Sequence, residues 1–119
     1  MELNKKVDQL LQELKSGKFN KVILEGKKLL KKYPDKEYLQ NICGLAHQRL
    51  NNIKTSIFYF KKAIELDPSN PGQKNNLANS YIYLNEYDKA RKPIYKTSID
   101  SNKHYLQSLE KYFNQLNYK

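Results

Sequence analysis

Residues 37–70, EYLQNICGLAHQRLNNIKTSIFYFKKAIELDPSN, contain two apolar stretches that are joined by a polar turn and closed by a proline. Large apolar residues recur every three or four positions in both stretches, as they do on one face of an α-helix. Pro68 ends the second stretch, because the residue before a proline is pushed out of helical geometry. This segment therefore predicts an antiparallel pair of helices.

The signals of this segment recur along the chain at a fixed interval. Gly17 and Asn51 lie in equivalent turns and are 34 residues apart. Pro34 and Pro68 are separated by the same interval. A fixed period of this length is typical of stacked helical repeats. We expect one all-α domain over 1–119, built from about seven helices in antiparallel pairs. Its frames are residues 3–36, 37–70 and 71–104, with a capping helix at 105–118.

Side-chain size within the central frame indicates how the helices pack. Two helices that cross closely need small side chains at the crossing point and large ones beside it. We expect Gly44 and Ala63 to allow the close approach, and Phe60 to fill the space between neighbouring pairs. Asn70 is expected to cap the next helix, and Pro93 is expected to kink the helix at 87–100.

The order of small and large residues resembles the tetratricopeptide repeat. The residues that carry the resemblance in the central frame are Gly44, His47, Ser56, Phe60, Ala63 and Pro68. The third frame matches best in its first half, and the first frame matches from Gly17 onward. The resemblance implies a right-handed α-solenoid, in which the first helices of successive pairs line a concave groove.

Members of this family bind proteins or peptides along that groove, so the resemblance implies a binding scaffold with a protein or peptide partner. The groove positions in this sequence are Tyr38, Asn41, Ile42, Leu45, Gln48, Arg49, Gly72, Asn75, Asn76, Asn79, Ile82 and Tyr83. Asparagine amides both donate and accept hydrogen bonds, so they suit a peptide backbone.

Two further resemblances concern the function of such repeats. The run 75–79 resembles the asparagine-bearing repeats of O-linked N-acetylglucosamine transferase. Short arrays of this kind also resemble segments that precede a sulfotransferase or glycosyltransferase domain, which implies a docking segment of a larger transferase as an alternative.

The carboxylate clamp that binds chaperone tails in some relatives is absent. That clamp is formed by lysine, arginine and asparagine side chains. Its positions in this sequence hold Val7, Leu11, Ile42, Gly72 and Asn76.

The net charge of +10 supports a different alternative, a module that binds nucleic acid or another anionic surface. Lys27, Lys28, Lys31 and Lys32 would be its centre. Of the 22 basic residues only Arg49 and Arg91 are arginine. Readers of bases and phosphates usually prefer the planar arginine fork, so the composition favours the peptide-binding interpretation.

Nothing in the sequence predicts catalysis, a metal site or a cofactor. Cys43 and His47 lie four residues apart on one helix and could touch, but Cys43 is expected to pack the core of its own pair and His47 to replace an aromatic packing residue. His104 is too far along the chain to join them as a metal ligand. The single cysteine and the absence of a secretory signal or of a membrane-spanning apolar run favour a cytoplasmic protein. Because no catalytic motif is found, we expect that the chain is not an enzyme.

Overall fold

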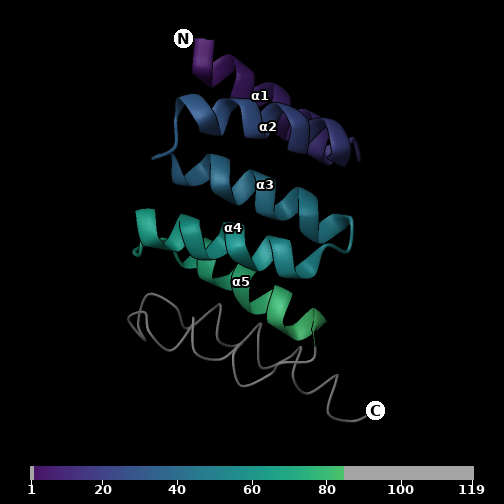
Figure 1. Cartoon of the computed structure of the whole chain (residues 1–119), viewed down its shortest axis with the longest axis vertical. Coiled ribbons are helices and arrows are strands. Elements are labelled where there is room, and N and C mark those ends of the chain that lie inside the picture. Colours follow the sequence, from purple (N-terminus) through teal and green to yellow (C-terminus); the bar gives the residue numbers. More distant parts are fainter. Residues whose placement is uncertain (1, 85–119) are drawn as a thin grey trace.

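The computed structural model of the chain describes residues 2–84, which form five α-helices and no strand (Figure 1). The helices are α1 (Glu2–Lys15), α2 (Phe19–Lys32), α3 (Glu37–Arg49), α4 (Ile53–Leu66) and α5 (Pro71–Tyr83). The all-α prediction is confirmed for this part of the chain. The other two expected helices, at 87–100 and 105–118, lie outside the described residues, as does the kink expected at Pro93.

Each complete pair turns on a residue with a left-handed backbone. Gly17 has a φ of 80° between α1 and α2, and Asn51 has a φ of 64° between α3 and α4. Glycine and asparagine are the residues that adopt this conformation most readily. The equivalence of the two turns, predicted from their spacing in the sequence, is thus visible in the backbone.

The breaks between pairs also follow the sequence. Tyr33 leaves helical geometry, with a φ of −130°, directly before Pro34. At the next break the side chain of Asn70 accepts a hydrogen bond of 2.9 Å from the backbone N–H of Gly72, and Pro71 is the first residue of α5. A proline at this place costs no hydrogen bond, since the first turn of a helix has no internal partner for its N–H. The predicted cap is confirmed.

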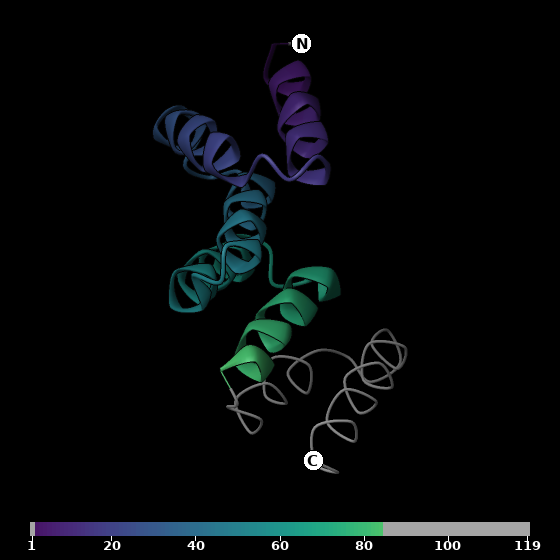
Figure 2. The same ribbon diagram turned by 90° about the vertical axis from the view of Figure 1, so that its right-hand side faces the viewer.

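The helices stack in successive pairs, and the second helices of the pairs lie together on one side of the stack. In Figure 2, α2 and α4 lie on one side, α1 and α5 lie on the other, and α3 lies between them. Each helix packs against the next helix along the chain, and α3 also contacts α1 and α5. Relative to α2 and α4, the first helices lie toward the other side of the stack, which we call the first-helix face. The exposed side of α2 and α4 is the second-helix face.

Close packing inside the second pair depends on Gly44. A Cβ atom at Gly44 would lie 2.6 Å from Cε1 of Phe60, so only glycine fits against this ring. Phe60 is fully buried and also packs in a cluster with Leu77, Ala78, Tyr81 and Ile82 of α5. The expected roles of Gly44 and Phe60 are confirmed. One ring fills the space both within the pair and toward the next pair.

A second glycine sets the distance between pairs. A Cβ atom at Gly26 of α2 would lie 2.6 Å from Sγ of Cys43 of α3. Cys43 is fully buried at this contact. Cys43 is buried, as its expected packing role predicts, and its sulfur also meets the preceding pair, a neighbour that the repeat period does not show.

The first pair has leucines where the second pair has small residues. Leu10 and Leu29 occupy the positions of the first frame that Gly44 and Ala63 occupy in the second. Both leucines are buried in a core cluster with Val22, Leu39, Ile42 and Ala46. Because their side chains occupy the crossing point, α1 and α2 diverge in Figure 2. The crossing of the first pair is consequently open, and a cleft lies between its helices.

Candidate functional site: the first-helix face

The first helices of the second and third pairs are joined by side-chain amides. The amide of Asn76 on α5 donates a hydrogen bond of 3.0 Å to Oδ1 of Asn41 on α3. The amide of Gln48 on α3 donates to Oγ of Ser80 at 2.9 Å and to the backbone oxygen of Asn76 at 3.4 Å. These contacts fix α3 and α5 side by side, so the amides hold fixed positions along the face.

Two buried serines continue this connection into the core. Ser56 and Ser80 are fully buried, and their hydroxyl oxygens lie 2.9 Å apart. Ser56 donates to the backbone oxygen of Ile53 at 2.6 Å, so its proton is used there. Ser80 must then donate to Ser56 while it accepts from Gln48. In this series of hydrogen bonds, Gln48 donates to Ser80, Ser80 to Ser56 and Ser56 to the backbone of α4. Both buried hydroxyl groups therefore have partners.

Sequence reasoning missed this hydroxyl pair. Ser56 was expected only as a small residue at its repeat position, and Ser80 was not singled out. Their contact joins helices of different pairs and depends on how one pair is rotated against the next. A serine in an otherwise apolar helix face is the one signal that could have indicated it.

The first-helix face keeps unused hydrogen-bonding groups. The amide N–H groups of Asn41 and the side-chain oxygen of Asn76 have no partner among residues 2–84, and neither do the side chains of Asn75 and Asn79. All four asparagines are half-buried. Partly shielded amides of this kind can exchange water for the N–H and C=O groups of a bound main chain.

The remaining groove positions differ in their exposure. Tyr38, Leu45 and Gln48 are half-buried, whereas Arg49 is exposed and Tyr83 is 62% exposed. Ile42 is only 3% exposed and packs in the core cluster of the first two pairs, so it offers almost no surface to a ligand. The face that a ligand could contact is therefore formed mainly by amides, with Tyr38 and Tyr83 near its two ends.

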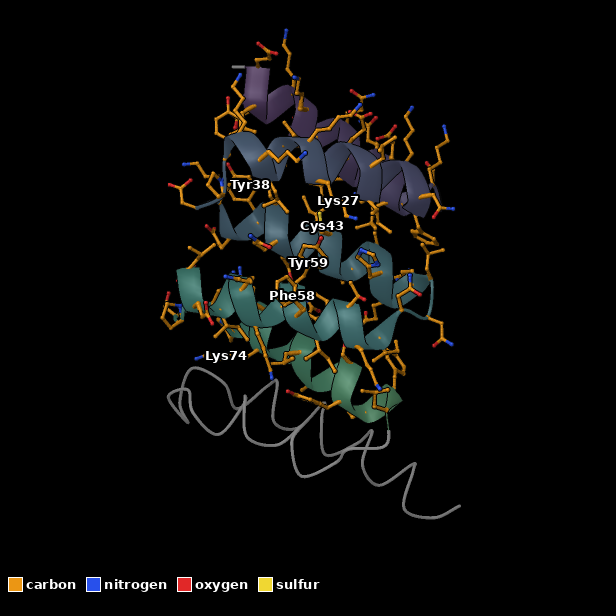
Figure 3. All side chains as sticks on the ribbon, viewed as in Figure 1. Lys27, Tyr38, Cys43, Phe58, Tyr59 and Lys74 are labelled. Carbon is orange, nitrogen blue, oxygen red and sulfur yellow. The ribbon has the colours of Figure 1, made fainter. Side chains whose placement is uncertain are left out.

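The pair Cys43 and His47 does not form a reactive couple. Burial raises the pKa of the Cys43 thiol to about 11, so the thiol stays protonated at neutral pH. His47 stacks on Tyr59 of α4, with ring centroids 5.4 Å apart, and its Nδ1 lies 3.4 Å from the amide of Asn52 (Figure 3 labels Cys43 and Tyr59). Burial, followed by the charge of Lys27, lowers the pKa of His47. Both side chains act as packing groups.

The cleft between α1 and α2 has a volume of about 380 Å³. Its floor contains Leu10 and Leu29, and its walls carry four lysines, two glutamates and Gln9. Glu13 is 7% exposed and forms an ion pair of 2.8 Å with Lys21. This end of the stack is therefore charged.

The family comparison decides what the repeated unit is. Residues 39–70, which include most of α3 and all of α4, match the family model described as tetratricopeptide repeat. Residues 39–70 are a tetratricopeptide repeat. The small and large residues of this tetratricopeptide repeat are those that meet in the structure, with Gly44 against Phe60 and Ala63 fully buried.

Solved structures of MamA have a similar fold. MamA 41-end from Desulfovibrio magneticus RS-1 aligns with a TM-score of 0.73 and 16% identity over 76% of this chain and 51% of that chain. MamA from AMB-1 aligns with a TM-score of 0.69 and 20% identity over 76% of this chain and 50% of that chain. The chain thus spans about half the length of these structures, and at such identity the likeness concerns the fold alone. No curated protein matched the sequence.

None of the helices in residues 2–84 is long and apolar enough to cross a membrane.

Proposed function

We propose that the chain is a protein-binding scaffold that holds an extended peptide segment on its first-helix face. The observation that carries the proposal is the amide pair of Asn41 and Asn76, which is fixed between two successive pairs and has donors and acceptors without a partner among residues 2–84. The tetratricopeptide repeat at 39–70 supports a role in protein interaction.

The chemistry of the face suits the backbone of a peptide better than a particular side chain. Asn41, Asn75, Asn76 and Asn79 lie within residues 41–79 on two adjacent first helices. Each amide can donate and accept, so it can pair with either polar group of a main chain in extended form. Arg49 adds a positive charge at the end of α3, where an acidic group of the peptide could bind.

The contacting residues can be tested with a displayed library of random peptides. Peptides selected on the wild-type chain would be measured against the triple variant Arg49→Ala, Asn76→Ala, Asn79→Ala. We expect affinity to fall about tenfold or more, since each lost hydrogen bond removes about 0.5–1.5 kcal/mol. The matched control is Asn20→Ala, Lys54→Ala, Thr55→Ala, which changes three exposed residues of α2 and α4 away from this face.

The helix content of both variants would be compared by circular dichroism. Weaker peptide binding by the first variant alone, at equal helicity, supports the proposal. Selected peptides that bind all three proteins equally would eliminate the first-helix face as the site.

The nucleic-acid alternative finds little support on this face. Among the first helices, α1 has three lysines and three acids, α3 has Arg49 and Glu37, and α5 has Lys74. This near balance of charge is not the basic groove that phosphate binding requires. The excess positive charge of the described residues lies on the second-helix face.

A further inference from the structure

The second helices carry most of the positive charge of residues 2–84. Helix α2 has five lysines and one glutamate, and α4 has three lysines and one glutamate, which gives a net charge of +6 for the two. The three first helices together carry +1 by the same count. Since α2 and α4 lie on one side of the stack (Figure 2), the charge is gathered on one face.

Each of these helices also exposes a large apolar side chain at the same repeat position. Leu24 and Phe58 occupy equivalent positions of the first two frames, and each is 57% exposed. Both are followed at the same spacing by two lysines, Lys27 and Lys28 after Leu24, and Lys61 and Lys62 after Phe58. Figure 3 labels Lys27 on α2 and Phe58 on α4. The face therefore repeats one unit, an apolar residue next to two lysines, on two adjacent second helices.

Other residues of the described segment 2–84 neutralise the charges on this face only in part. Lys28 lies 3.7 Å from Glu25, and Lys21 is paired with Glu13. Lys31 and Lys62 are exposed and form no ion pair or ring contact with any other described residue. They lie seven and four residues after the apolar residue of their helix, so they share its side.

The identity of the apolar residues discriminates between anionic partners. A nucleic-acid surface uses aromatic rings at such positions, because bases stack on them. Here leucine and phenylalanine occupy equivalent positions, so the shared property is apolar bulk and not an aromatic ring. Apolar side chains flanked by lysines are typical of elements that lie in the interface of an anionic bilayer, where lysine stems extend their charges to the headgroups.

We propose that the second-helix face binds the surface of an anionic phospholipid bilayer. Leu24 and Phe58 enter the interface, and Lys27, Lys31 and Lys62 contact the headgroups. This inference goes beyond the peptide scaffold. The first-helix face lies on the other side of the stack and remains open while the chain is bound to lipid.

Vesicle sedimentation at physiological salt tests the charges. The full chain would be mixed with vesicles of phosphatidylcholine and phosphatidylserine, or of phosphatidylcholine alone. We expect binding only to the first, and at least about a tenfold loss of binding for Lys31→Glu, Lys62→Glu. The control Lys5→Glu, Lys15→Glu makes the same change of net charge on α1 and should retain binding to within about threefold.

The apolar contribution is tested by Leu24→Ser, Phe58→Ser, which should weaken vesicle binding by about tenfold or more without a change of helicity. Failure of the wild-type chain to bind the phosphatidylserine vesicles would overturn the proposal. Equal losses of vesicle binding for Lys31→Glu, Lys62→Glu and for Lys5→Glu, Lys15→Glu would also overturn it. So would full binding by Leu24→Ser, Phe58→Ser. Single-stranded RNA that binds more tightly and displaces the vesicles would overturn it as well. Each of these results leaves the peptide measurements unaffected, so the two proposals can fail separately.

Discussion

Gly44 is the residue at which the packing of the central repeat is tightest. Alanine normally stabilises a helix relative to glycine, but here its Cβ would meet the ring of Phe60 at 2.6 Å. We expect Gly44→Ala to lower the free energy of unfolding by about 1–3 kcal/mol, as measured by chemical denaturation. In the background Phe60→Leu the same change should cost clearly less, because the ring that causes the clash is gone. Equal costs in both backgrounds would show that the two residues do not meet.

Cys43 should be a slow thiol. Burial removes it from solvent and raises its pKa to about 11, so both access and the thiolate fraction are low. We expect alkylation at neutral pH to proceed only as fast as the structure opens, and to become rapid in denaturant. A native alkylation rate close to that of an unfolded peptide would contradict the position of Cys43 between α2 and α3.

His47 should make stability depend on pH. Its pKa is lowered in the folded state, so the unfolded chain binds a proton first as the pH falls. Above the ordinary histidine pKa of about 6.5, the neutral side chain therefore makes its full contribution to the free energy of unfolding. This contribution is lost as the pH falls from that value toward the lower pKa of the folded state. The free energy of unfolding should decrease between about pH 7 and pH 5.5. The variant His47→Phe should show a smaller decrease over this range, and an unchanged slope would count against the burial of the imidazole.

At the scale of the helix, Asn70 is the residue that defines the start of α5. Replacing it with alanine removes the hydrogen bond to the N–H of Gly72 and should cost about 0.5–2 kcal/mol in a denaturant titration. Lys36 occupies the same position before α3 but makes no capping bond, so Lys36→Ala provides the control and should cost little. Similar effects of the two substitutions would contradict the assigned cap.

Helix ends were the part of the structure that sequence predicted best. Gly17, Pro34 and the Asn70–Pro71 step act locally, through backbone geometry that any sequence with these residues shares. The contact between Gly44 and Phe60 was also predicted from sequence, because both residues lie within one repeat. The repeat period was therefore sufficient for the pairs that the structure describes.

Contacts between pairs were predicted less well. The sulfur of Cys43 meets Gly26, and Ser80 meets Ser56, through the rotation of one pair against the next. Ile42 was expected to line the groove but is buried for the same reason. The asparagines were identified as candidates from their positions, whereas the bond between Asn41 and Asn76 could be found only in the structure.

At the scale of the whole molecule, the stack separates two kinds of surface. The first-helix face combines amides with little net charge, and the second-helix face combines lysines with the exposed side chains of Leu24 and Phe58. The peptide site and the lipid site that we propose lie on different sides of the stack, so the two ligands would not compete. Both faces exist only if successive helix pairs pack as Gly26 and Cys43 indicate.

Disulfide formation across that contact is the most direct test of the stack. In the variant Gly26→Cys the new thiol would lie beside Cys43, since a Cβ atom at this position is 2.6 Å from its Sγ. We predict that mild oxidation of the folded protein yields an intramolecular disulfide, seen as the loss of two hydrogen atoms by mass spectrometry and of both free thiols. Leu24→Cys, which places a thiol on the exposed side of the same helix, should not react with Cys43. If the Gly26→Cys protein kept two free thiols, or formed only intermolecular disulfides, the packing of successive pairs would be contradicted.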